Sequence, residues 1–151
     1  LQTRLDLDAV QLGKMVLRLP AVLGYSVEEN MEPTLEWLQT RLDLDDAGLR
    51  KMVLKHPQLL GYSIENNIQP KLCFLEEELG ISVSEVRASI VSAPSRLGLS
   101  LKTRYRPRLE VCRAAGVDAS LVLSYATNVD ERFCERVGVP LEALRAAQEN
   151  V

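Results

Sequence analysis

The sequence LQTRLDLD at residues 1–8 returns unchanged at residues 38–45, a shift of 37 residues. The same shift aligns further identical segments: KMVL at 14–17 with 51–54, GYS at 24–26 with 61–63, and prolines 20 and 33 with prolines 57 and 70. Self-similarity at a fixed period of roughly 20–50 residues is typical of arrays in which one small unit stacks on the next. The sequence therefore predicts a repeat protein with a unit of about 37 residues.

The later copies of the repeat diverge from the first two. The third copy keeps its register through Pro94, Gly98, Ser100 and Pro107, while most other positions have changed. A fourth copy begins near Cys112 and lacks the proline and the GYS segment, as terminal repeats often do because one face meets solvent. We expect one helical-repeat domain over residues 1–151, with repeats at about 1–37, 38–74 and 75–111 and a degenerate C-terminal unit at 112–151.

Local sequence signals predict the first helix of each repeat. Asp8 and Asp45 are suited to cap its N-terminus, and it must end before Pro20 or Pro57 because the residue before a proline resists the α conformation. Its apolar residues follow the helical i, i+3, i+4, i+7 spacing at Leu12, Met15, Val16 and Leu19. The P-x-x-L-G-Y segment that follows predicts a tight turn with a short 3₁₀ or helical piece.

A second, kinked helix is predicted to complete each repeat. Capping boxes are predicted for Ser26 with Glu29 and, at the first helix of the third repeat, for Ser82 with Glu85. Three equivalent prolines fall about two turns into the second helices: Pro33, Pro70 and Pro107. Because proline lacks an N–H and clashes with the preceding turn, a kink or a break is expected there. The predicted fold class is all-α, an α-solenoid (superhelix) whose repeats each contribute two helices plus a short turn-helix.

Composition excludes several protein classes. Apolar residues make up 46% and charged residues 26% of the chain, which is typical of a folded globular protein. The formal net charge of −3 lacks the strong positive balance of many nucleic-acid-binding domains. No apolar run approaches the ~18 residues of a membrane span. No targeting segment is visible, but the chain starts at Leu1 instead of Met, so we expect its N-terminus to be processed or truncated.

The segment KMVLKHPQLLGYSIENNIQPKLCFL at residues 51–75 resembles the motif of the mitochondrial transcription termination factor (mTERF) family. That motif has a proline ending the first helix, then Leu, Gly-Tyr-Ser, a second proline and an apolar Phe-Leu, and the resemblance covers roughly residues 1–110. It implies a superhelix with a concave groove that binds double-stranded DNA or structured RNA in a mitochondrion or chloroplast. Family roles include transcription termination, organellar gene expression and ribosome assembly, and some members work with a protein or a ribosome.

Four cations recur at equivalent positions of the first helices. Lys14 and Arg18 share a helix face at i, i+4 spacing, and their equivalents one repeat later are Lys51 and Lys55. Stacked repeats would align them in a ladder suited to neutralising phosphates, although the third repeat has no cation at these positions. The alternative is a solvated face with cations favourably placed near helix C-termini.

A second candidate contact is the acid-free stretch from residue 86 to 109. It contains six cations: Arg87, Arg96, Lys102, Arg104, Arg106 and Arg108. The planar fork of arginine suits phosphate oxygens, so the segment is predicted to contact nucleic acid or another anion. Charges at every second residue splay around a helix, and some of these side chains are expected to be structural instead, stacking on neighbours or pairing with Glu76–Glu78.

Nothing in the sequence predicts catalysis, a metal site or a cofactor. Residues that could suggest chemistry have simpler roles: His56 as a helix-end residue, Cys73, Cys112 and Cys134 as reduced, buried thiols, and Trp37, Tyr25 and Tyr62 as packing residues. There is no nucleophile–base pair, phosphate loop or carboxylate pair. We expect a non-enzymatic nucleic-acid-binding protein. The alternative is a protein-interaction scaffold or structural subunit in an organellar assembly such as a ribosome, which the negative charge and incomplete ladder favour.

Overall fold

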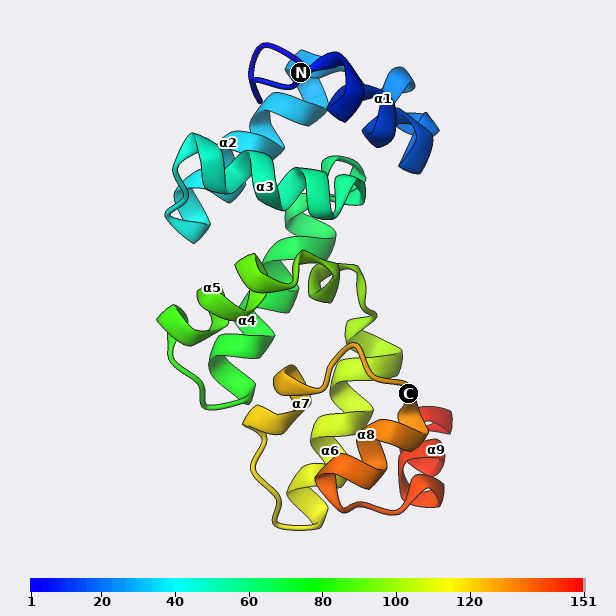
Figure 1. The fold of residues 1–151 in the computed structure, drawn as a ribbon. Helices are drawn as coiled ribbons and strands as arrows, with labels where there is room; N and C mark the ends of the chain where they lie inside the picture. Colours follow the sequence, from blue (N-terminus) through cyan, green and yellow to red (C-terminus); the bar gives the residue numbers. More distant parts are fainter. Residues whose placement is uncertain (151) are drawn as a thin grey trace.

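The computed structural model describes residues 1–150, which form an elongated stack of helices (Figure 1). Within these residues there are nine α-helices: α1 (Ala9–Arg18), α2 (Glu32–Leu42), α3 (Asp46–Lys55), α4 (Gln69–Glu78), α5 (Val83–Ser92), α6 (Arg106–Ala114), α7 (Ser120–Ser124), α8 (Asp130–Val137) and α9 (Leu141–Glu149). No strand occurs among them. The all-α helical-repeat prediction is confirmed.

The same order of elements occurs three times along the chain. Each first helix (α1, α3, α5) is followed by a 3₁₀ turn, a π turn and a second helix (α2, α4, α6). The 3₁₀ turns are Pro20–Gly24, Pro57–Gly61 and Pro94–Gly98, and the π turns are Val27–Met31, Ile64–Ile68 and Leu101–Tyr105. The C-terminal unit departs from this order, because the short α7 leads into α8 and α9, and α9 packs against α6. These last helices close the lower end of the stack in Figure 1.

Most predicted helix caps are present. Asp8 accepts a hydrogen bond from the Gln11 N–H at 2.7 Å, and Ser82 forms the predicted capping box with Glu85. The predicted box of Ser26 with Glu29 is wrong: the Ser26 hydroxyl accepts from the Glu29 N–H, but the Ser26 N–H donates to the Asn30 side chain at 3.2 Å. The cause is the π turn. Its turn holds more residues than an α-helical turn, so the side chain of Asn30, one position after Glu29, reaches the Ser26 N–H.

The three equivalent prolines lie where π turn changes to α-helix. Pro33, Pro70 and Pro107 are each the second residue of an α-helix, directly after a π turn. The π turn bonds i to i+5, so the chain enters the helix without needing the N–H that proline lacks. The expected kink or break stays a prediction: at these prolines the helical run changes from π to α without an interruption.

Tyrosine and glycine of the GYS segments form a joint between consecutive repeats. A Cβ placed on Gly61 would collide with the Tyr25 hydroxyl, and one placed on Gly98 would lie 2.8 Å from the Tyr62 hydroxyl. Each tyrosine therefore packs on the glycine of the following repeat. The third repeat, which has no such glycine after it, carries Leu99 in place of tyrosine. The predicted packing role of both tyrosines is confirmed.

Arg108 anchors the C-terminal unit. Its side chain is fully buried (0% exposed) and its partners are the carbonyl oxygens of Tyr125, Ala126 and Asn128, the Asp130 carboxylate at 2.7 Å, and the Phe133 ring at 4.2 Å. A buried guanidinium with these partners cannot meet a phosphate, so the predicted nucleic-acid contact of Arg108 is wrong. The equivalent residues Thr34 and Lys71 are also buried, which shows that this position faces inward in each of the first three repeats.

The ion pair of Arg108 with Asp130 makes stability depend on pH. Burial alone would raise the pKa of Asp130, but hydrogen bonds from Arg108 and Gln148 outweigh it and hold the pKa below its ordinary value. A lowered folded-state pKa contributes stability above the unfolded-state pKa of about 4, and this stability is lost as the pH falls through the folded-state value.

Replacing Asp130 with asparagine tests this dependence. We expect Asp130→Asn to lower the free energy of unfolding by about 1–2 kcal/mol at pH 7, because Arg108 loses its charged acceptor. The deficit should shrink as the pH falls below about 4, because the carboxylate of the unfolded chain becomes protonated there, and it should vanish once the pH has fallen through the lower pKa of the folded state. Urea unfolding at pH 7 and pH 3 measures it, with Glu131→Gln as an exposed neighbouring control. An equal deficit at both pH values would contradict the assignment.

Candidate nucleic-acid interface

A cationic cleft lies between α1 and α3. It has a volume of about 440 Å³ and is lined by Ala47, Leu54 and four cations, Arg18, Arg50, Lys51 and Lys55. No carboxylate lines it. Three of these cations belong to the predicted ladder, and stacking of the first two repeats brings them together around one hollow.

Two ladder residues also link consecutive repeats. Arg18 donates to the carbonyl oxygen of Leu54 at 3.1 Å, and Lys55 donates to that of Ser92 at 3.0 Å. Both acceptors lie at the C-terminus of the next first helix, where carbonyl groups lack intrahelical partners. The alternative to a ligand-binding ladder placed these cations near the C-termini of helices. In the structure Arg18 and Lys55 do contact a helix C-terminus, but it belongs to the first helix of the next repeat. Both side chains remain exposed.

Lys14 and Lys51 are the unengaged members of the ladder. Both side chains are exposed, and within residues 1–150 neither forms a hydrogen bond or ion pair with another side chain or with the backbone. Their amino groups are therefore free to meet a ligand without first breaking a protein contact.

Arg50 was missed by the sequence analysis. It donates to the backbone oxygen and the carboxylate of Asp6, both at 2.9 Å. Its equivalent, Arg87, donates to the carboxylate of Asp43 at 3.1 Å. Both aspartates have positive φ angles, 49° for Asp6 and 53° for Asp43, and Asp43 is the residue that caps the C-terminus of α2. The repeat pattern did not single out Arg50, because the equivalent residue of the first repeat is Gly13.

The basic stretch at 87–108 divides into engaged and free cations. Arg96 donates to the backbone and hydroxyl oxygens of Ser89, and Arg104 donates to the carbonyl of Asn128. Burial lowers the pKa of Arg96. Lys102 is exposed without a protein partner within residues 1–150, and exposed Arg106 lies 5.4 Å from the centre of the Phe74 ring. For Arg87, Arg96 and Arg104, ligand contact stays a prediction.

The carboxylates of Glu76 and Glu78 have partners outside the basic stretch. Glu76 pairs with Arg41 at 2.6 Å, and Glu78 pairs with Arg113 at 2.9 Å. The alternative that these residues pair with cations of residues 102–108 is therefore wrong for Glu76 and Glu78. Lys102 and Arg106 form no ion pair within residues 1–150, and we name these two exposed cations the third-repeat basic patch.

Charge changes sign along the starts of the second helices. At three sets of equivalent positions, the first two repeats have acidic or neutral residues and the third has a cation. From the first to the third repeat, these sets are Glu28, Glu65 and Lys102; Asn30, Asn67 and Arg104; and Glu32, Gln69 and Arg106. Acidic residues stabilise a helix N-terminus, whereas cations there oppose the helix dipole. The cations at the start of α6 thus do not serve its helical stability, and a bound anion would be favoured by both the cations and the dipole.

Comparison with known proteins agrees with this architecture. The model of the protein family described as mTERF matches residues 1–133 of the chain. The chain belongs to the mTERF family. Membership suggests an organellar nucleic-acid-binding helical-repeat protein. A comparison with curated proteins found no match.

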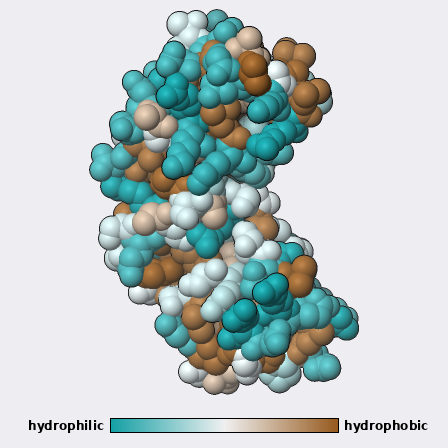
Figure 2. All heavy atoms as spheres, viewed as in Figure 1, coloured by the Kyte–Doolittle hydropathy of each residue, from teal (hydrophilic) through white to brown (hydrophobic). Residues whose placement is uncertain are grey.

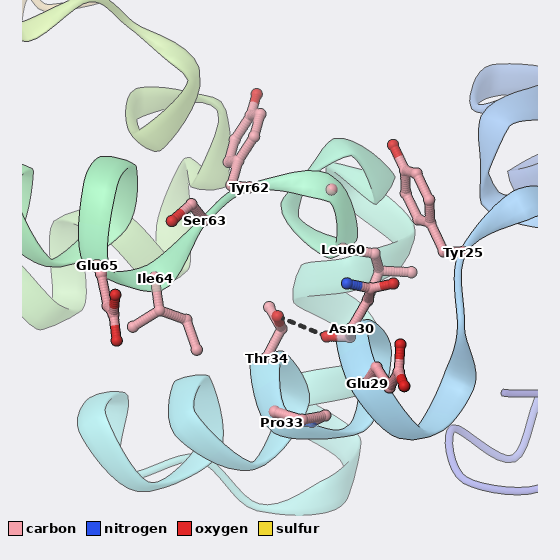
Figure 3. A pocket seen from close by; sticks show the side chains of 11 residues that line it. Tyr25, Glu29, Asn30, Pro33, Thr34, Leu60, Tyr62, Ser63, Ile64 and Glu65 are labelled. Atoms are coloured by element: carbon pink, nitrogen blue, oxygen red, sulfur yellow. Dashed lines mark hydrogen bonds between the residues drawn. The ribbon is translucent and has the colours of Figure 1, made fainter.

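A second cleft of this mTERF protein has the opposite character. It lies between the GYS segments of the first two repeats, has a volume of about 440 Å³, and is lined by both tyrosines. Figure 3 shows Tyr25 and Tyr62 rising from the two turns, with Glu29 and Glu65 on the segments that follow them. No cation lines this cleft. Its carboxylates would repel a phosphate backbone, so it is not part of the proposed interface.

The remaining candidate residues have structural surroundings. His56 shares a 3.0 Å hydrogen bond with the Tyr62 hydroxyl, and burial lowers its pKa. Cys112 and Cys134 are buried as predicted, whereas Cys73 is half-buried. Within residues 1–150 no cluster of His, Cys, Asp or Glu side chains is arranged to hold a metal ion. None of the helices in that range combines the length and apolar character that a membrane span requires.

Proposed function

We propose that this mTERF-family protein binds the phosphate backbone of double-stranded DNA or structured RNA and acts in organellar transcription termination, its regulation or gene expression. The observation that carries the proposal is the cationic cleft, where Arg18, Arg50, Lys51 and Lys55 line one hollow without a carboxylate. The third-repeat basic patch provides a further contact.

The physical basis is electrostatic. Neutralising phosphates with Lys and Arg releases condensed counterions, which supplies most of the affinity and makes it fall as salt rises. Exposed Lys14 and Lys51 can join this contact without losing a protein partner. Arg18 and Lys55 are held in place by carbonyl groups of the next repeat, so their positions are set before a ligand arrives.

Removing the two unengaged lysines tests the proposal. We expect Lys14→Gln with Lys51→Gln to weaken binding to organellar duplex DNA or ribosomal RNA fragments by about tenfold at low salt. The slope of log affinity against log salt should become shallower by about 2, because two phosphate contacts are lost. Filter binding at several salt concentrations measures both quantities.

A matched control is available on α8. Arg132→Gln with Arg136→Gln removes the same charge from exposed positions outside the cationic cleft, and it should change affinity much less. If both pairs weaken binding equally, only net charge matters and the cleft is not the contact. Binding without salt dependence would contradict the proposal altogether.

The second cleft, between the GYS segments of the first two repeats, supports a second candidate function. Its tyrosines and carboxylates suit a basic protein segment, which would make the chain a scaffold in an organellar assembly. Co-purification from organelle extract with and without nuclease separates the two functions. Nuclease should release partners that are held through nucleic acid and retain those held by direct protein contact.

A further inference from the structure

One position of the repeat supplies a cation to the joint that follows it. Lys71 in the second repeat and Arg108 in the third are equivalent, and both are buried. The Lys71 ammonium group donates to the carbonyl oxygen of Leu97 at 2.6 Å, and the Arg108 guanidinium donates to carbonyl oxygens of the C-terminal unit. In these two repeats the position therefore holds a cation against backbone carbonyls of the next unit.

The surroundings of Lys71 show what binds an ammonium group in such a joint. Besides bonding to the Leu97 carbonyl, the ammonium group donates to the Oδ1 atom of Asn67. Its Nζ atom lies 5.8 Å from the centre of the Tyr62 ring. Carbonyl oxygens accept hydrogen bonds from an ammonium group, and the face of an aromatic ring attracts a cation. These three partners stabilise a charge that is otherwise costly to bury.

The first joint, between the first and second repeats, contains the same three kinds of partner but no cation. Thr34 is the equivalent of Lys71, and its hydroxyl donates to the Asn30 backbone oxygen at 2.8 Å (Figure 3). The cleft between the GYS segments lies at this joint, and Thr34 lines it. It is also lined by the equivalents of the three Lys71 partners, which are Asn30, Leu60 and Tyr25. The first joint thus has a place for an ammonium group and no lysine to fill it.

Two carboxylates give the first joint a negative charge that the second joint lacks at the same positions. Glu29 and Glu65 line the cleft, and neither forms an ion pair among the residues that the structure describes. Their equivalents one repeat later are Asn66 and Lys102. Hydrogen bonds between an ammonium group and a carboxylate are stronger than those between neutral groups. An incoming ammonium group would thus find charged acceptors in the joint that has no cation of its own.

The cleft is accessible from solvent. Its lining residues Glu29, Asn30 and Glu65 are exposed, and its volume is about 440 Å³. Figure 2 shows mainly hydrophilic side chains on the visible face of the first two repeats, which occupy the upper half of Figure 1. These surroundings suit a ligand that enters through a charged group.

We propose that the cleft of the first joint binds a primary ammonium group supplied from outside these repeats, as the second joint binds the ammonium group of Lys71. The ammonium group donates to the Leu60 carbonyl and to the two carboxylates, beside the ring of Tyr25. A lysine side chain of a partner protein and a free alkylamine both present this chemistry. The proposal rests on the second candidate function, in which the cleft takes a basic protein segment, and it names the group that enters.

Titration with a lysine peptide and its modified form tests the site. The probe is a glycine peptide with one central lysine, acetylated and amidated at its ends, and NMR signals of Leu60 and Gly61 report its binding. We expect millimolar affinity, and affinity weaker by about tenfold or more for the same peptide with Nε-acetyl-lysine, which has no charge.

Butylamine separates the two sources of the ammonium group. A lysine peptide that binds about tenfold more tightly than butylamine identifies a protein segment as the ligand, and equal affinities identify a free amine. Absence of binding by both amines, or equal binding of the acetyl-lysine peptide, would overturn the proposal.

Thr34→Lys supplies the missing cation from within the chain. Its ammonium group should occupy the cleft as that of Lys71 occupies the second joint, so we expect affinity for the lysine peptide to fall by about tenfold or more. Thr40→Lys is the matched control, because it makes the same exchange at an exposed position of α2 that does not line the cleft. It should alter the affinity by less than about twofold. Equal losses for the two variants would show that added positive charge acts at a distance, and would overturn the proposal.

A second pair of variants does not depend on fitting a longer side chain into the joint. Glu29→Gln with Glu65→Gln changes exposed residues and should weaken binding of the lysine peptide by about fivefold. Glu28→Gln with Glu36→Gln removes the same charge from exposed positions that do not line the cleft, and it should have a smaller effect. Equal effects of the two pairs would also overturn the proposal.

The outcomes separate this site from the proposed functions. Thr34→Lys and Thr40→Lys should bind duplex DNA with equal affinity, because neither residue lines the cationic cleft. Failure of nucleic-acid binding therefore leaves the ammonium site intact. Proteins that co-purify after nuclease treatment, and that the Thr34→Lys variant still retains, would uphold the scaffold function while excluding the ammonium site.

Discussion

Replacing Arg108 with leucine is expected to lower the free energy of unfolding by about 3–5 kcal/mol, the largest effect of any single exchange considered for this protein. The substitution removes a guanidinium that donates to three backbone carbonyls and to the Asp130 carboxylate, and it leaves this half-buried carboxylate without its paired charge. Since domains are stable by only about 5–15 kcal/mol, this loss threatens folding at physiological temperature.

The matched control is Arg106→Leu, the same exchange two residues away. Arg106 is exposed and its guanidinium lies 5.4 Å from the centre of the Phe74 ring, so its removal should cost less than about 1 kcal/mol. Urea unfolding followed by circular dichroism measures both variants. Similar losses for the two arginines would show that Arg108 does not anchor the C-terminal unit.

Gly61→Ala should give the second-largest effect, a loss of about 1–3 kcal/mol through overpacking. The new methyl would meet the hydroxyl and the ring of Tyr25, whose Cζ lies 3.0 Å from the added Cβ. The ring must move away, and the joint between the first two repeats opens with it. Thermal and urea unfolding measure the loss.

Two further variants isolate the cause. Gly24→Ala makes the same change at the same position of the repeat, but with no atom within 4 Å, so its effect should stay within about 0.5 kcal/mol. Tyr25→Phe combined with Gly61→Ala removes the clashing hydroxyl and should recover part of the stability. Equal losses for Gly24→Ala and Gly61→Ala would point to backbone conformation instead of the tyrosine joint.

Local features of this fold were predictable because short segments of sequence determine them. Asp8 and Ser82 cap the helices that follow them, and proline prevents the helix from continuing at Pro20 and Pro57. The exception is Ser26, whose predicted box assumed an α-helical start. The π turn alters which neighbour reaches the Ser26 N–H, and nothing in the spacing of serine and glutamate reveals it.

The candidate interface was only partly predictable. Lys14, Arg18, Lys51 and Lys55 were identified from their repeated positions, and three of them line one cleft. Charge alone could not separate the buried Arg108 from the exposed Arg106, because both lie in the same acid-free stretch. The repeat alignment carried a signal, because Arg108 is equivalent to Thr34 and Lys71 and all three side chains are buried.

The sequence by itself determined the period, the helix starts and stops, and the family, since these depend on contacts within a few residues and on identity between copies. Only the tertiary structure decided which cations are free. Stacking places the C-termini of α3 and α5 beside a cation of the preceding repeat. It also buries the residue that follows Pro33, Pro70 and Pro107. Whether an arginine side chain meets solvent or buried carbonyls depends on residues some 20 positions away, which no local pattern encodes.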